Sequence, residues 1–448
     1  MVPQSPMRCA TLLLILALAA CSTASPSASP SAGSSATAPG SAAASASQAP
    51  AVTPGPPLAV SGEHACALPG DGTVKCWGFN YYGELGDGKQ TDPNIPAGDT
   101  LPLVANTVIA APGSSTPLTN VRAIGAGLRH TCAVLADTTV KCWGWNSMIS
   151  GPSAITGTGG QLGDGSTLDR LTPVMVIAAA GSTDPLVGVS AIAGGWFHTC
   201  ALMLDATVKC WGTNQHGELG DGTFDGSTAP VTVIAAPNST SPLSDVLAIA
   251  AGDLRTCALL IDTTVTCWGS SYISQFSSSG PGVDPAPVPV ADSAGAGVLS
   301  GVTAIAVAGG FTQDVGGFLA CALMTSQKVK CWGANDNGSL GDGTTTSSPT
   351  AVDVAGLPGA ATAITGGCAL LADTTVACWP QFDANGQLVK APALVMDGEG
   401  STTPLKGVTT MALGNFQSCA VLTDGSVTCW SSSGVAPRTV PGVVVSGS

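Results

Sequence analysis

The stretch CALMLDATVKCWG occupies residues 200–212, and variants of it occur seven times along the chain. The other copies are CALPGDGTVKCWG from Cys66, CAVLADTTVKCWG from Cys132, CALLIDTTVTCWG from Cys257, CALMTSQKVKCWG from Cys321, CALLADTTVACWP from Cys368 and CAVLTDGSVTCWS from Cys419. Successive first cysteines lie 66, 68, 57, 64, 47 and 51 residues apart. Similarity repeated at such intervals indicates one small structural unit used seven times.

Each copy has the pattern of an antiparallel hairpin, with apolar segments on both sides of a short turn such as Ala136-Asp137-Thr138. Between copies lie a Pro-Val segment, as at residues 172–177, and a second apolar segment, as at residues 189–195. Each unit therefore contains four short strands. The 58 glycines and 32 prolines among 448 residues are typical of a turn-rich, all-β chain.

Seven four-stranded units predict a seven-bladed β-propeller over residues 58–448, in preference to an open solenoid. The first unit begins at Leu58 without a preceding Pro-Val strand, whereas the C-terminus supplies an extra one at residues 440–445. We therefore expect the C-terminal strand to complete the first blade. This would close the ring and leave no exposed sheet edge between its ends.

Fourteen of the 16 cysteines form pairs ten residues apart, and only Cys9 and Cys21 fall outside this pattern. An even spacing across a hairpin places both side chains opposite each other on one face, within disulfide range. The predicted disulfides, one per blade, are Cys66–Cys76, Cys132–Cys142, Cys200–Cys210, Cys257–Cys267, Cys321–Cys331, Cys368–Cys378 and Cys419–Cys429.

Zinc is the alternative explanation of the cysteine pairs, because His64, His130 and His198 each precede a cysteine by two residues. Each unit, however, offers at most three such ligands, and a structural zinc site needs four. We therefore expect no metal and no cofactor.

The N-terminus has the features of a targeting segment. Arg8 precedes an apolar run at residues 11–20, which predicts a signal peptide over residues 1–20. Leu18-Ala19-Ala20-Cys21 resembles the lipobox of bacterial lipoproteins, which implies acylation of Cys21; ordinary secretion is the alternative. The rest of residues 21–57 is an uncharged Ser/Ala/Pro-rich stretch, which predicts a disordered tether. We expect an extracytoplasmic protein, lipid-anchored to the bacterial cell membrane.

The charge balance excludes some classes of function. Asp and Glu outnumber Lys and Arg by 28 to 14, giving a net charge of −14, which disfavours nucleic-acid binding. No apolar run reaches the ~18 residues that a membrane-spanning helix needs, so contact with the membrane is expected through the lipid only.

Two segments carry a resemblance to a known family. GWFHTCAL at residues 195–202 and VKCWGTNQHGELG at residues 208–220 resemble the repeat of the RCC1 (regulator of chromosome condensation) family. The resemblance implies a seven-bladed propeller, and its architecture is similar to that of RCC1-like bacterial β-lactamase inhibitors. Because members include exchange factors, enzyme inhibitors and interaction platforms, the resemblance leaves the function open.

The chain contains no nucleophile elbow, zinc-protease motif, phosphate-binding loop or dinucleotide fingerprint. Three of the four histidines occupy one repeated framework position, where a structural role is expected. We therefore predict no catalytic residues and no enzyme activity.

Positions that differ between the copies are the candidates for recognition. Between the glycine and the histidine position of each unit stand aromatic, leucine and arginine residues, which are typical anchors of protein interfaces. The candidate binding face consists of Leu128, Arg129, Trp196, Phe197, Leu254, Phe311 and Phe416. A second set follows the Trp-Gly step and contains Phe79, Tyr81, Tyr82 and Trp145. The alternative is that these rings pack into the blade core.

The sequence therefore favours a non-catalytic, membrane-anchored binding module, expected as a monomer, that recognises a protein or a cell-envelope polymer through one propeller face. The alternatives are an RCC1-type regulator of guanine-nucleotide exchange, a secreted enzyme inhibitor and, less favoured, an envelope hydrolase or lyase. The last would need carboxylates converging near the ring axis.

Overall fold

The computed structural model describes residues 57–62, 64–91, 103–147, 159–270, 283–293, 297–308, 318–379, 381–382, 388–389, 391–414, 417–431 and 437–446. The predicted signal peptide, Cys21 and nearly all of the tether lie outside these residues, as do Phe311 and Phe416. Within the described part of the chain, every regular element is a β-strand. None of its segments forms an apolar helix of membrane-spanning length.

The strands form seven four-stranded antiparallel sheets, and in each sheet the strands follow one another in chain order from the innermost outward. The innermost strands are β1 (Leu58–Val60), β5 (Val121–Ala126), β9 (Val189–Gly194), β13 (Val246–Gly252), β17 (Val302–Ala308), β21 (Ala361–Ile364) and β27 (Val408–Leu413). The second strands are β2 (His64–Ala67), β6 (His130–Leu135), β10 (His198–Met203), β14 (Arg255–Leu260), β18 (Leu319–Met324), β22 (Cys368–Leu371) and β28 (Gln417–Leu422).

The third and fourth strands complete each blade. The third strands are β3 (Lys75–Gly78), β7 (Val140–Gly144), β11 (Val208–Gly212), β15 (Val265–Ser270), β19 (Val329–Gly333), β23 (Val376–Cys378) and β29 (Ser426–Ser431). The outermost strands are β4 (Asn106–Thr107), β8 (Arg170–Met175), β12 (Ser227–Thr232), β16 (Val283–Pro289), β20 (Ser348–Asp353), β26 (Ala393–Leu394) and β30 (Arg438–Val444). A separate short hairpin, β24 (Gln381–Phe382) with β25 (Leu388–Val389), follows the third strand of the sixth blade.

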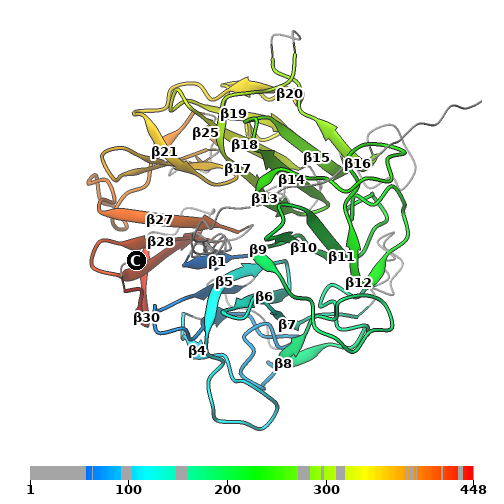
Figure 1. Ribbon diagram of the computed structural model, residues 1–448. Helices are drawn as coiled ribbons and strands as arrows, with labels where there is room; N and C mark the ends of the chain where they lie inside the picture. The colour runs from blue at the N-terminus through cyan, green and yellow to red at the C-terminus, as the bar shows by residue number, and fades with distance from the viewer. Residues whose placement is uncertain are drawn as a thin grey trace, which may run out of the picture. The chain divides into compact units, whose positions relative to one another are not determined.

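The seven sheets follow one another around a ring, so that the last blade lies beside the first (Figure 1). Strands β27 and β28 of the seventh blade contact β1 of the first, and β1 in turn contacts β5 of the second. The predicted all-β, seven-bladed propeller is thereby confirmed.

The expected role of the C-terminal strand is not found. Strand β30 pairs with β29 as the outer strand of the seventh blade, and the first blade has four strands of its own, β1 to β4. The Pro-Val segments are outermost strands of the preceding blade, where a free edge tolerates the missing N–H of proline. Within the described residues, no sheet therefore combines strands from both ends of the propeller.

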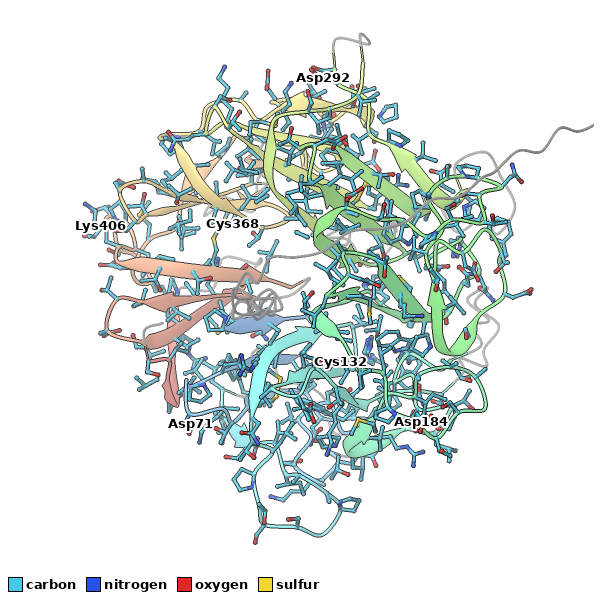
Figure 2. The ribbon with its side chains drawn as sticks, in the orientation of Figure 1. Asp71, Cys132, Asp184, Asp292, Cys368 and Lys406 are labelled. Carbon is cyan, nitrogen blue, oxygen red and sulfur yellow. A yellow bond between two sulfur atoms is a disulfide. The ribbon has the colours of Figure 1, made fainter. Side chains whose placement is uncertain are left out.

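Each predicted cysteine pair is a disulfide within one blade, between directly opposed residues of the second and third strands. The paired Cα atoms lie 4.0–4.1 Å apart. The disulfides of Cys132 and Cys368 can be located in Figure 2 by their labels. The ten-residue spacing thus fixes the hairpin register in all seven blades.

The tryptophan after each second cysteine packs between blades. Trp143, Trp211 and Trp268 donate their indole N–H to backbone carbonyls of the preceding blade, at Glu84, Gln161 and Glu218, over 2.8–2.9 Å. A glycine lies against the ring: a Cβ at Gly163 would stand 2.8 Å from Nε1 of Trp211. The Leu-Gly-Asp-Gly segment of one blade therefore packs against the tryptophan ring of the next blade.

Candidate functional site

Two kinds of loop meet at one end of the ring. His64, His130 and His198 begin the second strands and pair directly with Gly78, Gly144 and Gly212, which end the third strands. The loops before the histidines and the segments after the glycines therefore emerge together. We call this the loop end, and we call the opposite end, which carries the hairpin turns, the turn end.

Five side chains from three blades form a continuous group at the loop end, which we call the aromatic–arginine cluster: Tyr82, Arg129, Trp145, Trp196 and Phe197. Tyr82 and Trp145 stack with centroids 5.3 Å apart, and Trp145 meets Phe197 edge to face at 5.4 Å. Trp196 contacts Phe197 at 5.9 Å. The Arg129 guanidinium lies 5.3 Å from the Tyr82 ring and 5.7 Å from the Trp145 ring, within cation–π range.

The cluster combines residues that the sequence placed in two separate candidate sets. Arg129 and Trp196 are partly exposed, as is Tyr82, whereas Trp145 and Phe197 are only 7% and 6% exposed. Phe197 therefore packs beneath the surface against Trp145 and Trp196, and its ring is not available to a partner. Leu128 and Leu254 are partly buried in the adjoining loops. Phe79 and Tyr81 form a separate stack, with centroids 5.2 Å apart.

Backbone hydrogen bonds hold these loops to one another across blade boundaries. Leu128 donates its N–H to the carbonyl of Gly195 over 3.3 Å, and Trp196 donates to the carbonyl of Asp253 over 2.8 Å. Within the second blade, Trp145 donates its N–H to the carbonyl of Arg129 over 2.8 Å. The side chains of the cluster are thus fixed in place by the framework of blades two to four.

Beneath the loops, the repeated histidines link neighbouring blades. Nε2 of His64 lies 2.6 Å from Oγ1 of Thr131, and the same atom of His130 lies 2.8 Å from Oγ1 of Thr199. Because Thr199 donates its hydroxyl to the carbonyl of Gln161, His130 donates through Nε2. His198 makes the corresponding contact with Thr256 at 2.8 Å.

These imidazoles are held in the neutral form. Burial lowers the pKa of His64 and of His130 to about 3 and that of His198 to about 4, from an ordinary value of 6.5. A neutral imidazole can donate through only one nitrogen, which suits the single threonine acceptor. The predicted framework role of these histidines agrees with their burial and contacts.

Sequence reasoning missed a second arginine–aromatic contact in the fourth blade. Arg255 stands at the histidine position and lies 4.6 Å from the ring of Phe318. Its Nη1 donates to the carbonyl of Ser270 over 2.9 Å and lies 3.8 Å from Oδ2 of Asp284. Burial lowers the pKa of Arg255 to about 10, against the opposing effect of Asp284. The sequence did contain a signal for this contact, because arginine replaces histidine at this repeated position of the fourth blade.

The ring axis offers little acid–base chemistry within the described part of the chain. The seven innermost strands contain no Asp, Glu, His or Cys. Among the residues with described positions, no group of three or more His, Cys, Asp or Glu side chains could hold a metal ion. The aromatic–arginine cluster is therefore the candidate functional site.

Comparison with known proteins agrees with the repeat pattern. The model of the regulator of chromosome condensation (RCC1) repeat matches residues 58–84, 121–148 and 189–218, which lie in the first three blades. The ultraviolet-B receptor UVR8 of Arabidopsis thaliana is 29% identical over 219 residues, covering 49% of this chain and 42% of UVR8. The human E3 ubiquitin-protein ligase HERC2 is 29% identical over 285 residues, covering 63% of this chain and 5% of HERC2.

The chain thus spans less than half the length of either relative. Among solved structures, human WBSCR16 is similar with a TM-score of 0.57 at 16% identity, covering 82% of this chain and 93% of that one, which bears on the fold alone. The repeats, the seven-bladed ring and the matched segments agree: the chain carries RCC1 repeats and has an RCC1-like propeller fold.

Proposed function

We propose that this chain is a non-catalytic, extracytoplasmic binding module, anchored through a lipid on Cys21 and acting as a monomer. The observation that carries the proposal is the aromatic–arginine cluster, where loops of three blades hold Tyr82, Arg129 and Trp196 partly exposed at one end of the ring. Partly exposed tyrosine, tryptophan and arginine on a rigid support are the usual anchors of an interface.

The relatives support a binding or regulatory role without naming a partner. RCC1-repeat propellers carry many functions on one scaffold, so the site and not the fold must decide. The alignment covers only 5% of HERC2, and its ligase activity is therefore no basis for assigning one to this chain. The absence of acidic residues, histidine and cysteine from the innermost strands supports a non-catalytic role.

The anchor rests on the sequence before the propeller. A lipid on Cys21 followed by an uncharged Ser/Ala/Pro-rich tether would hold the ring close to a membrane surface. With about 36 residues, such a tether has a mean reach of roughly 30 Å. A partner would then be sought in the cell envelope or just outside it.

One experiment tests both parts of the proposal. Intact producing cells are treated with a membrane-impermeant, amine-reactive cross-linker, and adducts of the full chain are resolved by size. We expect an adduct for the wild type and for Ile261→Ala, a control at a 65%-exposed position of the turn end. Trp196→Ala should remain on the cell without the adduct, and Cys21→Ala should appear in the medium.

Equal adducts from the wild type and from Trp196→Ala would contradict the binding site. Retention of Cys21→Ala on the cells would contradict the anchor. The melting temperature of each variant, measured on purified protein, shows whether the ring is intact.

A further inference from the structure

Three of the four aromatic rings of the cluster are poorly placed to stack on a sugar. Stacking a sugar requires an open ring face, but Tyr82 stacks on Trp145, and Phe197 packs edge to face against Trp145. Trp145 and Phe197 are both more than nine-tenths buried. The partly exposed groups are the Tyr82 ring, the Trp196 ring and the Arg129 guanidinium, which are the side-chain types most enriched at protein interfaces.

The surface around the cluster is acidic. In the described segments 79–91, 145–147, 159–170 and 213–226, the exposed or partly exposed carboxylates outside ion pairs are Asp87, Asp169, Asp221 and Asp225. Lys89 is the single lysine in those segments, and Arg129 of the cluster is a further, partly exposed cation, so these four carboxylates outnumber the two cations. Arg170 forms an ion pair with Asp164 at 2.7 Å, so these two charges cancel and do not change the local net charge. The local charge has the same sign as the net charge of −14 of the whole chain.

Charge and aromatic contacts specify different properties of the partner. Because both ends of the ring carry exposed aspartates, acidity sets the sign of the partner's charge but not the place where it docks. The aromatic–arginine cluster is confined to the loop end of blades one to three and fixes the place. Complementary charge mainly raises the association rate, whereas desolvated aromatic anchors slow dissociation.

Resting on the proposed binding function, we propose that the loop end of blades one to three docks a folded protein with a positively charged surface. The partner covers Tyr82, Arg129 and Trp196, and its basic side chains face Asp169 and Asp225. A cell-envelope polysaccharide is the competing class of ligand, and the test separates the two.

The test places a photo-cross-linking amino acid, p-benzoylphenylalanine, in the full chain in its producing cells. Position Leu128 lies in a loop beside the cluster without belonging to it, and Ile261 at the turn end is the control. Adducts are digested and identified by mass spectrometry after irradiation. We expect Leu128 to capture a protein with a net positive charge at pH 7, and Ile261 not to capture it.

The charge requirement is tested in the same cross-linked chain. Asp169→Asn with Asp225→Asn should lower the Leu128 adduct about threefold or more at low salt, since steering between exposed charges is salt-dependent. The asparagine at 169 keeps the oxygen that accepts the N–H of Asn146 and of Ser147. Asp184→Asn with Asp397→Asn makes the same change of charge in exposed loops of the turn end and should leave the yield unchanged.

A glycan adduct, an acidic protein or a salt-insensitive yield would overturn this inference and leave the binding function standing. No adduct at Leu128, or the same adduct at both positions, would contradict the binding function itself.

Discussion

At the scale of single residues, the ring depends on polar side chains that cross from one blade to the next. His64, His130 and His198 each reach a threonine of the following blade, and each of three tryptophans reaches a carbonyl of the preceding one. Buried polar groups that lose a partner cost about 1–3 kcal/mol each. These contacts therefore constrain how the blades fit together as well as how strongly they associate.

The three framework histidines, His64, His130 and His198, predict a loss of stability in mild acid. Their pKa values of about 3 to 4 in the folded chain lie below the ordinary 6.5. Between pH 4 and 6.5, these imidazoles are therefore protonated only in the unfolded chain. The free energy of unfolding is therefore highest above pH 6.5. As the pH drops below 6.5, it decreases by about 1.4 kcal/mol per pH unit for each histidine. Urea unfolding between pH 7.5 and 5.0 measures this slope.

The matched variant is His198→Gln, because glutamine stands at the same position of the seventh blade as Gln417. It can still donate to Thr256 but does not titrate, so its slope should be smaller by the contribution of one histidine. The aspartates of the hairpin turns do not interfere: hydrogen bonds lower the pKa of Asp205 below 3.8, outside this window. An unchanged slope in His198→Gln would show that the pKa of this imidazole is not lowered in the folded chain.

At the scale of elements, the hairpin turn shows how one local solution recurs with different residues. Oδ1 of Asp137 accepts the N–H and the hydroxyl of Thr139, and Asp205 and Asp262 do the same for the threonine two residues later. The residue between them has a positive φ, 69° at Thr138 and 62° at Ala206. This left-handed conformation costs a non-glycine residue about 1–2 kcal/mol.

Two substitutions in equivalent turns should therefore differ in effect. Ala206→Gly removes the strain and should stabilise the chain by about 0.5–1 kcal/mol, since glycine loses part of the gain through its greater freedom when unfolded. Thr263→Gly removes the same strain but also the hydroxyl that accepts the N–H of Gly301 over 3.0 Å, and should give no gain. Thermal unfolding of both variants checks this, and equal shifts would contradict it.

The strands and disulfides could be predicted because they depend on local spacing. A ten-residue separation across a hairpin leaves one register in which both cysteines face each other, and the structure has that register in every blade. The blade to which a Pro-Val segment belongs is a different matter. Both neighbouring units are equally close in sequence, so the pattern could not show that residues 172–177 extend the blade of Cys132.

At the scale of the whole molecule, the cluster shows where sequence reasoning stops. The periodic pattern placed Arg129, Trp196 and Tyr82 in loops, because each stands at a repeated position next to a glycine or histidine. Their mutual contacts depend on the rotation between blades, which no single repeat encodes. Arg129 reaches back to Tyr82 of the first blade, and Trp145 lies between Tyr82 and Phe197 of the third. The burial of Phe197 follows from the same packing.

Closure of the ring is also a property of the assembled blades. In the described part of the chain the first and seventh blades share no sheet, and their side chains pack together instead: Val440, Val443 and Val445 lie with Leu58 and Val60 in one apolar core. The N–H of Ser446 donates to the carbonyl of Pro69 over 3.0 Å. The last strand thus joins the two ends of the propeller by packing against the first blade.

Neighbouring valines of this strand give a direct test of that closure. Val443 is 2% exposed and belongs to the shared core, whereas Val444 is 60% exposed. Val443→Ala should cost about 1.5–2.5 kcal/mol, from lost burial and the cavity left behind. Val444→Ala should change stability by less than about 0.5 kcal/mol, as exposed substitutions usually do. If the two variants unfold at the same urea concentration, packing of the last strand contributes nothing to closure. The contact between the first and seventh blades must then depend on β27 and β28 against β1 and on the hydrogen bond from Ser446 to Pro69.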